Sequence, residues 1–112
     1  MRFLVLMAEE DHFDRWETAS EELHQAFFDG LASFTAAVEE RGSVLFGAAL
    51  ARPEQAVTVR GEHTTAGPYA ETGEQVGGFY VVDLPSREAV LETARLLPVP
   101  AVEVRPLVEV DG

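Results

Sequence analysis

The chain has 112 residues, no cysteine, and 20 acidic against 8 basic residues, which gives a formal net charge of −12. This length predicts one domain over residues 1–112 with a single core, and the lack of cysteine excludes disulfides and thiolate chemistry. The charge disfavours nucleic acid and anionic membranes as partners, and without a long apolar run or a leader-like N-terminus we expect a cytoplasmic protein.

The first quarter of the chain predicts a strand followed by the start of a long helix. Residues 2–8 form a short apolar run that is typical of a buried strand. A polar insert over residues 9–17 comes next. The helix then begins at a Thr18–Glu21 capping box, with Ser20 as the alternative cap.

The long helix is expected to end at Gly42, and a second strand follows over residues 43–50. Gly30 interrupts the helix and is expected to allow close packing on a sheet. The apolar residues of the helix follow helical spacing, so one face should be buried. These residues are Leu23, Phe27, Leu31, Phe34 and Val38.

The second half of the chain predicts a hairpin and then a strand, a helix and a strand. Residues 55–60 alternate as a strand, and Gly61–Glu62 is a two-residue turn that sends residues 63–65 back antiparallel. The remaining expected elements are a strand over 77–84, a helix opened by Pro85 and Ser86, and a final strand over 101–110.

This order of elements predicts an α+β fold. Two helices, each with one apolar stripe, on one face of a largely antiparallel sheet give a ferredoxin-like two-layer sandwich. The second face of the sheet then has no cover within the chain. We therefore expect a homodimer that buries it.

Residues 66–83, "AGPYAETGEQVGGFYVVD", resemble the signature of the YCII-related family in its DGPF-motif branch. The family's run is an Asp-Gly-Pro-Phe turn, then Ala-Glu-Thr-Lys-Glu, then a Gly-Gly-Tyr-Tyr strand. The resemblance extends over nearly the whole chain. It implies a dimeric α+β barrel with a ferredoxin-like protomer and a shared cleft beside the signature loop.

The chain departs from the family pattern in two ways. Ala66 stands where the signature has Asp, and Gly73 stands where it has Lys. The resemblance further implies that the enzyme-like branch of the wider family uses a His near the middle of its first helix and an Asp at the end of its second. Those positions correspond to Leu31 and Leu97 here, so this pair is absent and the enzyme hypothesis is weakened.

The candidate catalytic residues are His24 and Glu71. His24 lies seven residues before Leu31 on the same helical face, where an imidazole could transfer protons, although a boundary histidine is the simpler interpretation. Glu71 could act with Glu74 as acid and base. Alternatively, either carboxylate could pair with a cross-strand arginine, Arg60 or Arg105.

The candidate ligand-binding residues surround the signature turn. Gly67 and Pro68 fix a rigid turn that is expected to aim Tyr69 and Glu71 at the mouth of a cleft, with His24 on its far wall. Tyr80 could face the same cleft. A purely structural loop is the alternative.

A metal site and an organic cofactor are not expected. His12 lies among four acidic residues, but the three histidines have neither His-x-His nor i, i+4 spacing. The acidic neighbours of His12 are Glu9, Glu10, Asp11 and Asp14.

Three functions remain open. The first is a lyase- or isomerase-like enzyme that uses His24 or Glu71 as base, which rests on analogy with related barrels. The second is a domain that binds a small molecule in the cleft without catalysis. The third is a partner module linked to sigma-factor regulation, because relatives can occur fused or adjacent to such factors.

Overall fold

The computed structural model describes residues 1–70 and 73–110. No helix in this part of the chain is long and apolar enough to cross a membrane. In chain order the elements are β1 (Arg2–Glu10), α1 (His12–Thr18), α2 (Glu21–Glu39), β2 (Ser43–Ala49), the 3-10 turn η1 (Pro53–Gln55), β3 (Val57–Arg60), β4 (His63–Ala66), β5 (Glu74–Asp83), α3 (Arg87–Ala94) and β6 (Ala101–Pro106).

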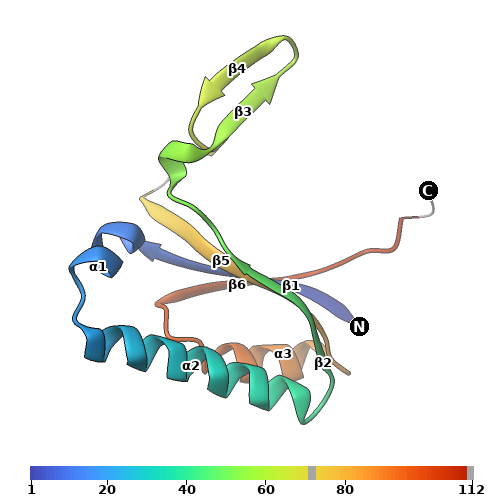
Figure 1. Ribbon diagram of the computed structural model, residues 1–112. Coiled ribbons are helices and arrows are strands. Elements are labelled where there is room, and N and C mark those ends of the chain that lie inside the picture. The colour runs from blue at the N-terminus through green and yellow to red at the C-terminus, as the bar shows by residue number, and fades with distance from the viewer. Residues whose placement is uncertain (71–72, 111–112) are drawn as a thin grey trace.

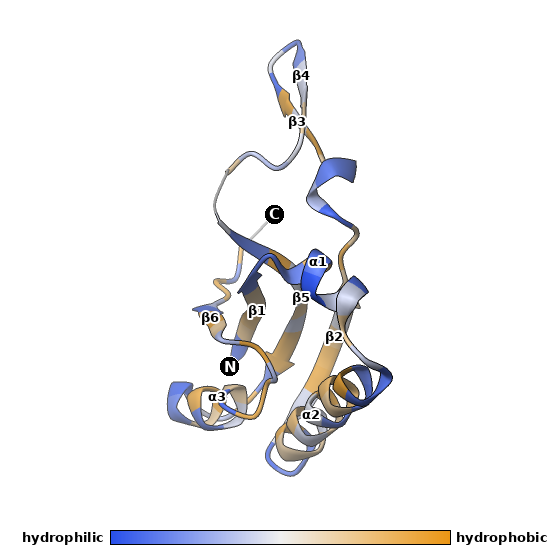
Figure 2. Ribbon diagram, turned by 90° about the vertical axis from the view of Figure 1, so that its left-hand side faces the viewer, coloured by the Kyte–Doolittle hydropathy of each residue, from blue (hydrophilic) through white to orange (hydrophobic). Residues whose placement is uncertain are grey.

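The main sheet has four strands in the order β2-β5-β1-β6, and all of its neighbouring strands are antiparallel. Helices α2 and α3 lie side by side on one face of this sheet (Figures 1 and 2). The predicted ferredoxin-like sandwich is confirmed. The short helix α1 lies at the end of the sheet where β1 finishes (Figure 1).

The core lies between the sheet and the two long helices. Alternation along β1 points Phe3 and Val5 toward the helices, and their partners in β5 point the same way. Phe34 and Val38 of α2 belong to the same core cluster as Phe3 and Val5, and these four side chains are fully buried. The first half of the predicted α2 stripe does not reach this core, because it extends past the sheet toward α1.

The insert after β1 is a helix, which the sequence did not predict. Asp11 has a left-handed backbone with a φ of 53°, and this turns the chain from β1 directly into α1. Ser20 caps α2 by accepting a hydrogen bond from the Leu23 N–H at 3.2 Å. The predicted Thr18 cap is wrong, because Thr18 ends α1 and its hydroxyl donates to the Asp14 carbonyl at 3.0 Å.

Two glycines permit close contacts between distant segments. A Cβ on Gly42 would overlap the backbone carbonyl oxygen of Asp83, so the turn after α2 lies directly against the end of β5. A Cβ on Gly30 would lie 2.9 Å from Pro98 in the turn after α3. Gly30 therefore packs on that turn and not on the sheet as expected.

Strands β3 and β4 form a separate two-stranded sheet, which we call the arm (57–66). The predicted two-residue turn is confirmed, since Arg60 pairs with His63 and Gly61 has a φ of 59°. The arm projects from the body on the side away from α2 and α3 (Figure 1). The expectation of one sheet for all strands is wrong, because the chain leaves the main sheet after β2 before the hairpin begins.

The last two strands differ from their predicted bounds. Strand β5 begins at Glu74, three residues earlier than expected, and pairs with β1 along its whole length. Strand β6 ends at Pro106, since a proline has no N–H to continue the ladder. Leu107 still donates its N–H to the Arg2 carbonyl at 2.9 Å, and residues 108–110 are exposed.

Candidate functional site

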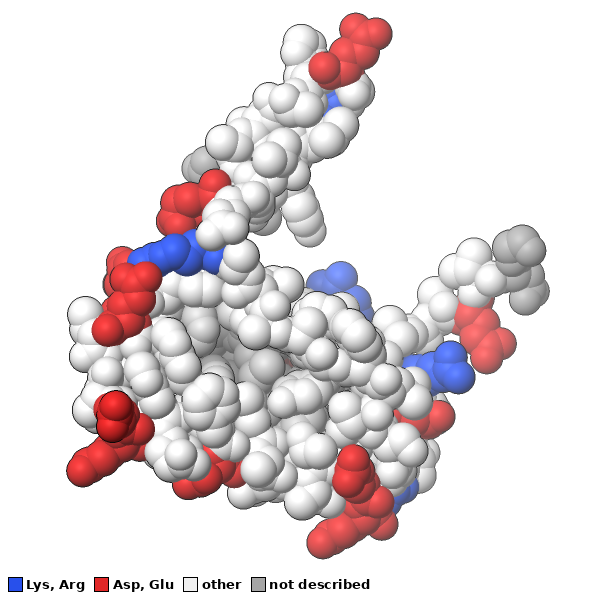
Figure 3. Space-filling model, in the orientation of Figure 1, with Lys and Arg blue, Asp and Glu red and all other residues white. Residues whose placement is uncertain are grey.

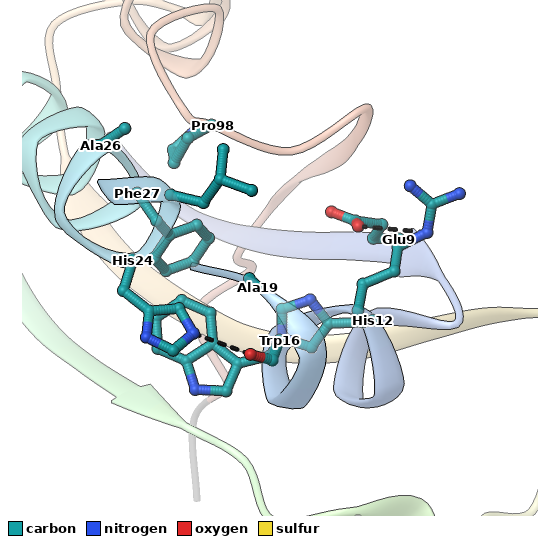
Figure 4. A pocket seen from close by; sticks show the side chains of 10 residues that line it. Glu9, His12, Trp16, Ala19, His24, Ala26, Phe27 and Pro98 are labelled. Carbon is teal, nitrogen blue, oxygen red and sulfur yellow. Dashed lines mark hydrogen bonds and ion pairs between the residues drawn. The ribbon is translucent and has the colours of Figure 1, made fainter. Parts of the chain in front are cut away.

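A cavity of about 330 Å³ lies between α1, the first turns of α2 and the turn after α3 (Figure 4). Its walls are mainly apolar, with Trp16 from α1, Leu23 and Phe27 from α2, and Pro98 from the turn. The cavity exists because the apolar stripe of α2 continues beyond the sheet. The first half of this stripe therefore faces α1 across a gap that the side chains of neither helix fill.

Trp16 and His24 form one wall of the cavity as a stacked pair. Their ring centroids lie 4.0 Å apart with an interplanar angle of 23°. Nε2 of His24 lies 2.7 Å from the Trp16 carbonyl oxygen (Figure 4). Because a carbonyl oxygen only accepts, this nitrogen carries the proton and donates. His24 thus lines this cavity, which is not the cleft beside the signature turn where His24 was expected. The bond joins α2 to the last turn of α1.

His12 is the second imidazole of the cavity, and its position depends on Gly77. A Cβ on residue 77 would overlap the His12 ring, so only glycine in β5 admits the ring there. The ring contacts Phe13 edge-on at 4.9 Å between centroids. His12 is half-buried, and its imidazole has no hydrogen bond to any residue in the described ranges 1–70 and 73–110.

His12 is a site residue that sequence reasoning missed, because it was weighed only as a metal ligand. The described residues contain no group of three His, Cys, Asp or Glu side chains that could hold a metal ion. The signal in the sequence is the Gly77–Gly78 pair, because adjacent glycines in a strand allow another group to approach closely, although they do not identify that group.

Charged residues hold α1 in place beside the cavity. Arg52, which follows β2, contacts Asp14 at 2.8 Å and Glu17 at 3.0 Å. Its guanidinium also lies 5.8 Å from the centroid of the Phe13 ring. At the cavity rim, Glu9 and Arg15 approach each other at 3.7 Å, so the rim charges largely cancel (Figure 4).

The signature turn lies at the base of the arm. Gly67 has a φ of 97°, and its carbonyl oxygen accepts a hydrogen bond from the Thr58 hydroxyl at 2.8 Å. The side chain of Tyr69 is 80% exposed, and its carbonyl oxygen accepts from Arg60 at 3.4 Å. Gly67, Pro68 and Tyr69 line neither this cavity nor a second one of about 250 Å³ between α3 and β6. Glu71 lies outside the described residues.

Tyr80 lies on the helix side of β5 and not beside the signature turn. Its ring packs on Phe34 at 4.9 Å between centroids and covers Gly47, where a Cβ would lie 2.6 Å away. Its neighbour Phe79 faces the opposite side of the sheet. Arg105, one proposed partner for the loop carboxylates, forms an ion pair with Glu103 of its own strand.

The model of a family described as the YCII-related domain matches residues 1–111. A search of curated proteins finds no match.

Proposed function

The chain belongs to the YCII-related family, and we propose that this member binds a small neutral aromatic molecule in the cavity between α1 and α2. The observation that carries the proposal is His12, a half-buried imidazole without a hydrogen-bond partner among the described residues, at the wall of a mainly apolar cavity. The Gly67–Pro68 turn further supports assignment to the DGPF-motif branch.

The size of the cavity suits a one-ring or two-ring molecule. Its volume is at the small end of the range of about 300–1,000 Å³ that is typical of ligand pockets. Trp16, Leu23 and Phe27 offer apolar contact to the body of such a ligand. His12 can donate or accept one hydrogen bond, which favours a ring that carries a hydroxyl or carbonyl group.

The charge of the protein argues for a neutral ligand. The net charge of −12 repels anions from the whole surface. Arg15, a cation at the rim, is already paired with Glu9. An aromatic carboxylate would therefore meet net repulsion, and the described residues that line the cavity offer no arginine or lysine besides Arg15 to offset it.

We expect 4-methylphenol to bind more tightly than toluene or 4-methylbenzoate. The phenol adds a hydrogen bond to His12 that toluene lacks, and it avoids the repulsion of the benzoate. His12→Leu should weaken 4-methylphenol binding about 10-fold, equivalent to about 1.4 kcal/mol for one lost hydrogen bond, and leave toluene binding nearly unchanged. The indole N–H signal of Trp16, the only tryptophan, reports the titration by NMR.

The matched control is His63→Leu, which removes an exposed histidine of the arm. It should leave the affinity for all three probes unchanged. Equal losses of phenol and toluene affinity in His12→Leu would mean that His12 only shapes the cavity. Tighter binding of the benzoate would refute the argument from charge.

We also propose that the protein is a homodimer that packs the sheet faces opposite α2 and α3 against each other. Alternation along the strands supports an apolar centre for this face. Phe46 is 58% exposed, and its ring lies 5.9 Å from that of Phe79. The apolar side chains of this face are Leu4, Leu6, Phe46, Phe79 and Val81.

The charges of the same face support pairing with itself. By register, Arg2 and Asp83 lie at one end of the face, and Glu103 and Arg105 lie on β6. Glu10 and Glu74 lie at the other end of the face. Apart from that end, its two cations balance its two remaining anions, whereas the chain as a whole is strongly acidic. In a two-fold dimer the same patch of each protomer faces the other, and a patch with balanced charges is not repelled by its counterpart.

Leu6→Glu should convert the dimer into a monomer, because it would bury one unpaired carboxylate from each copy in the apolar centre. Light scattering coupled to size exclusion gives the mass directly. Leu96→Glu, a matched change at an exposed leucine after α3, should stay dimeric. A wild-type chain that is monomeric at micromolar concentration would refute the homodimer.

A further inference from the structure

We propose that the arm (57–66) clasps a second copy of this chain and packs its apolar flank against that copy. The proposal rests on the homodimer proposed above and adds a second contact surface outside the sheet face. It assigns a role to a segment that neither the core nor the cavity uses.

The arm has one apolar and one polar flank. Pairing of Val57 with Ala66 and of Val59 with Thr64 places these four residues on the same flank. The side chains of Val57 and Val59 are 64% and 67% exposed, which is high for adjacent β-branched residues of one strand face. An isolated two-stranded hairpin is only marginally stable in water. Cover on this flank would therefore stabilise the arm.

The direction of the arm indicates which part of the assembly could bury its apolar flank. It projects from the end of the sheet on the side opposite α2 and α3, which is the side of the bare sheet face (Figure 1). A body seated on that face would lie beside the arm. The radius of gyration is 15.5 Å, against about 13 Å for a compact chain of this length, so the protomer alone is extended.

The charge of the arm favours a second copy over nucleic acid or lipid. Residues 57–70 contain one arginine and one glutamate, so this segment is neutral and the remainder of the chain carries the charge of −12. A nucleic-acid-binding arm needs several cations, which are missing here. Glu62 in the turn places an acid at the tip (Figure 3), which opposes insertion into a membrane. A neutral flank can approach an acidic copy without repulsion.

Two measurements test the arm separately from the homodimer. The double variant Val57→Ser, Val59→Ser should raise the dissociation constant of the dimer about 10-fold or more, as expected for two valines that lose burial. The matched control, Thr58→Ser with Thr65→Ser on the polar flank, should leave it unchanged. Analytical ultracentrifugation gives both constants.

The second measurement is hydrogen exchange of the arm, which is made without the double variant. Amides of residues 57–66 should exchange about 10-fold more slowly in the wild-type dimer than in the Leu6→Glu monomer. A stable wild-type dimer with unchanged affinity in the double variant and equal exchange in both states would refute the arm and leave the homodimer standing. A monomeric wild-type chain would refute the homodimer, and the arm proposal with it.

Discussion

Phe34→Ala is expected to lower the free energy of unfolding by about 3–5 kcal/mol, the usual range for truncating a fully buried phenylalanine. The side chain of Phe34 has no exposed surface and packs on Tyr80 of the sheet, so its loss leaves a cavity between the two layers. Urea unfolding at one fixed protein concentration measures the change.

Phe28→Ala is the control for this prediction, because it makes the same change on the same helix. The Phe28 side chain is 53% exposed and touches Trp16 edge-on at 5.6 Å. Its truncation should cost about 1 kcal/mol or less. Similar losses at positions 34 and 28 would contradict a core located between the sheet and the second half of α2.

Gly42→Ala is expected to lower the free energy of unfolding by about 3 kcal/mol, the upper part of the usual range for overpacking. The added methyl group would overlap the carbonyl oxygen of Asp83, and backbone on both sides of this contact must move to relieve it. Gly73→Ala is the control, since its nearest neighbour would be the Glu10 carboxylate at 4.0 Å. It should stay within about 1 kcal/mol of wild type, and an equal loss at both positions would contradict the close contact at Gly42.

The elements that the sequence predicts well are those with a long local pattern. The apolar stripe of α2 and the alternating strands have enough residues for their periods to be clear. Helix α1 was missed because it has only seven residues and its apolar side chains, such as Trp16, face a cavity. The separation of the arm was missed because strand propensity does not specify which sheet a strand joins.

The candidate site could be predicted only in part. His24 was expected beside the signature turn, and no local pattern predicts that its Nε2 bonds the Trp16 carbonyl of another helix. The contact of His12 with Gly77 joins segments that are far apart in the sequence. Tyr69 was expected at the cleft, but its turn lies at the base of an arm that leaves the body. Such placements depend on tertiary structure.

The most direct test of the proposed binding site is a map of NMR chemical-shift changes in the ¹⁵N-labelled protein as 4-methylphenol is added. We predict saturable changes at the Trp16 indole and the His12 backbone amide, which belong to residues that line the cavity, and at the amide of Gly77, against which the His12 ring lies. Val59 on the arm should not respond. Saturable changes centred on Tyr69 or Phe79, with Trp16 unaffected, would place the binding site elsewhere and contradict the account.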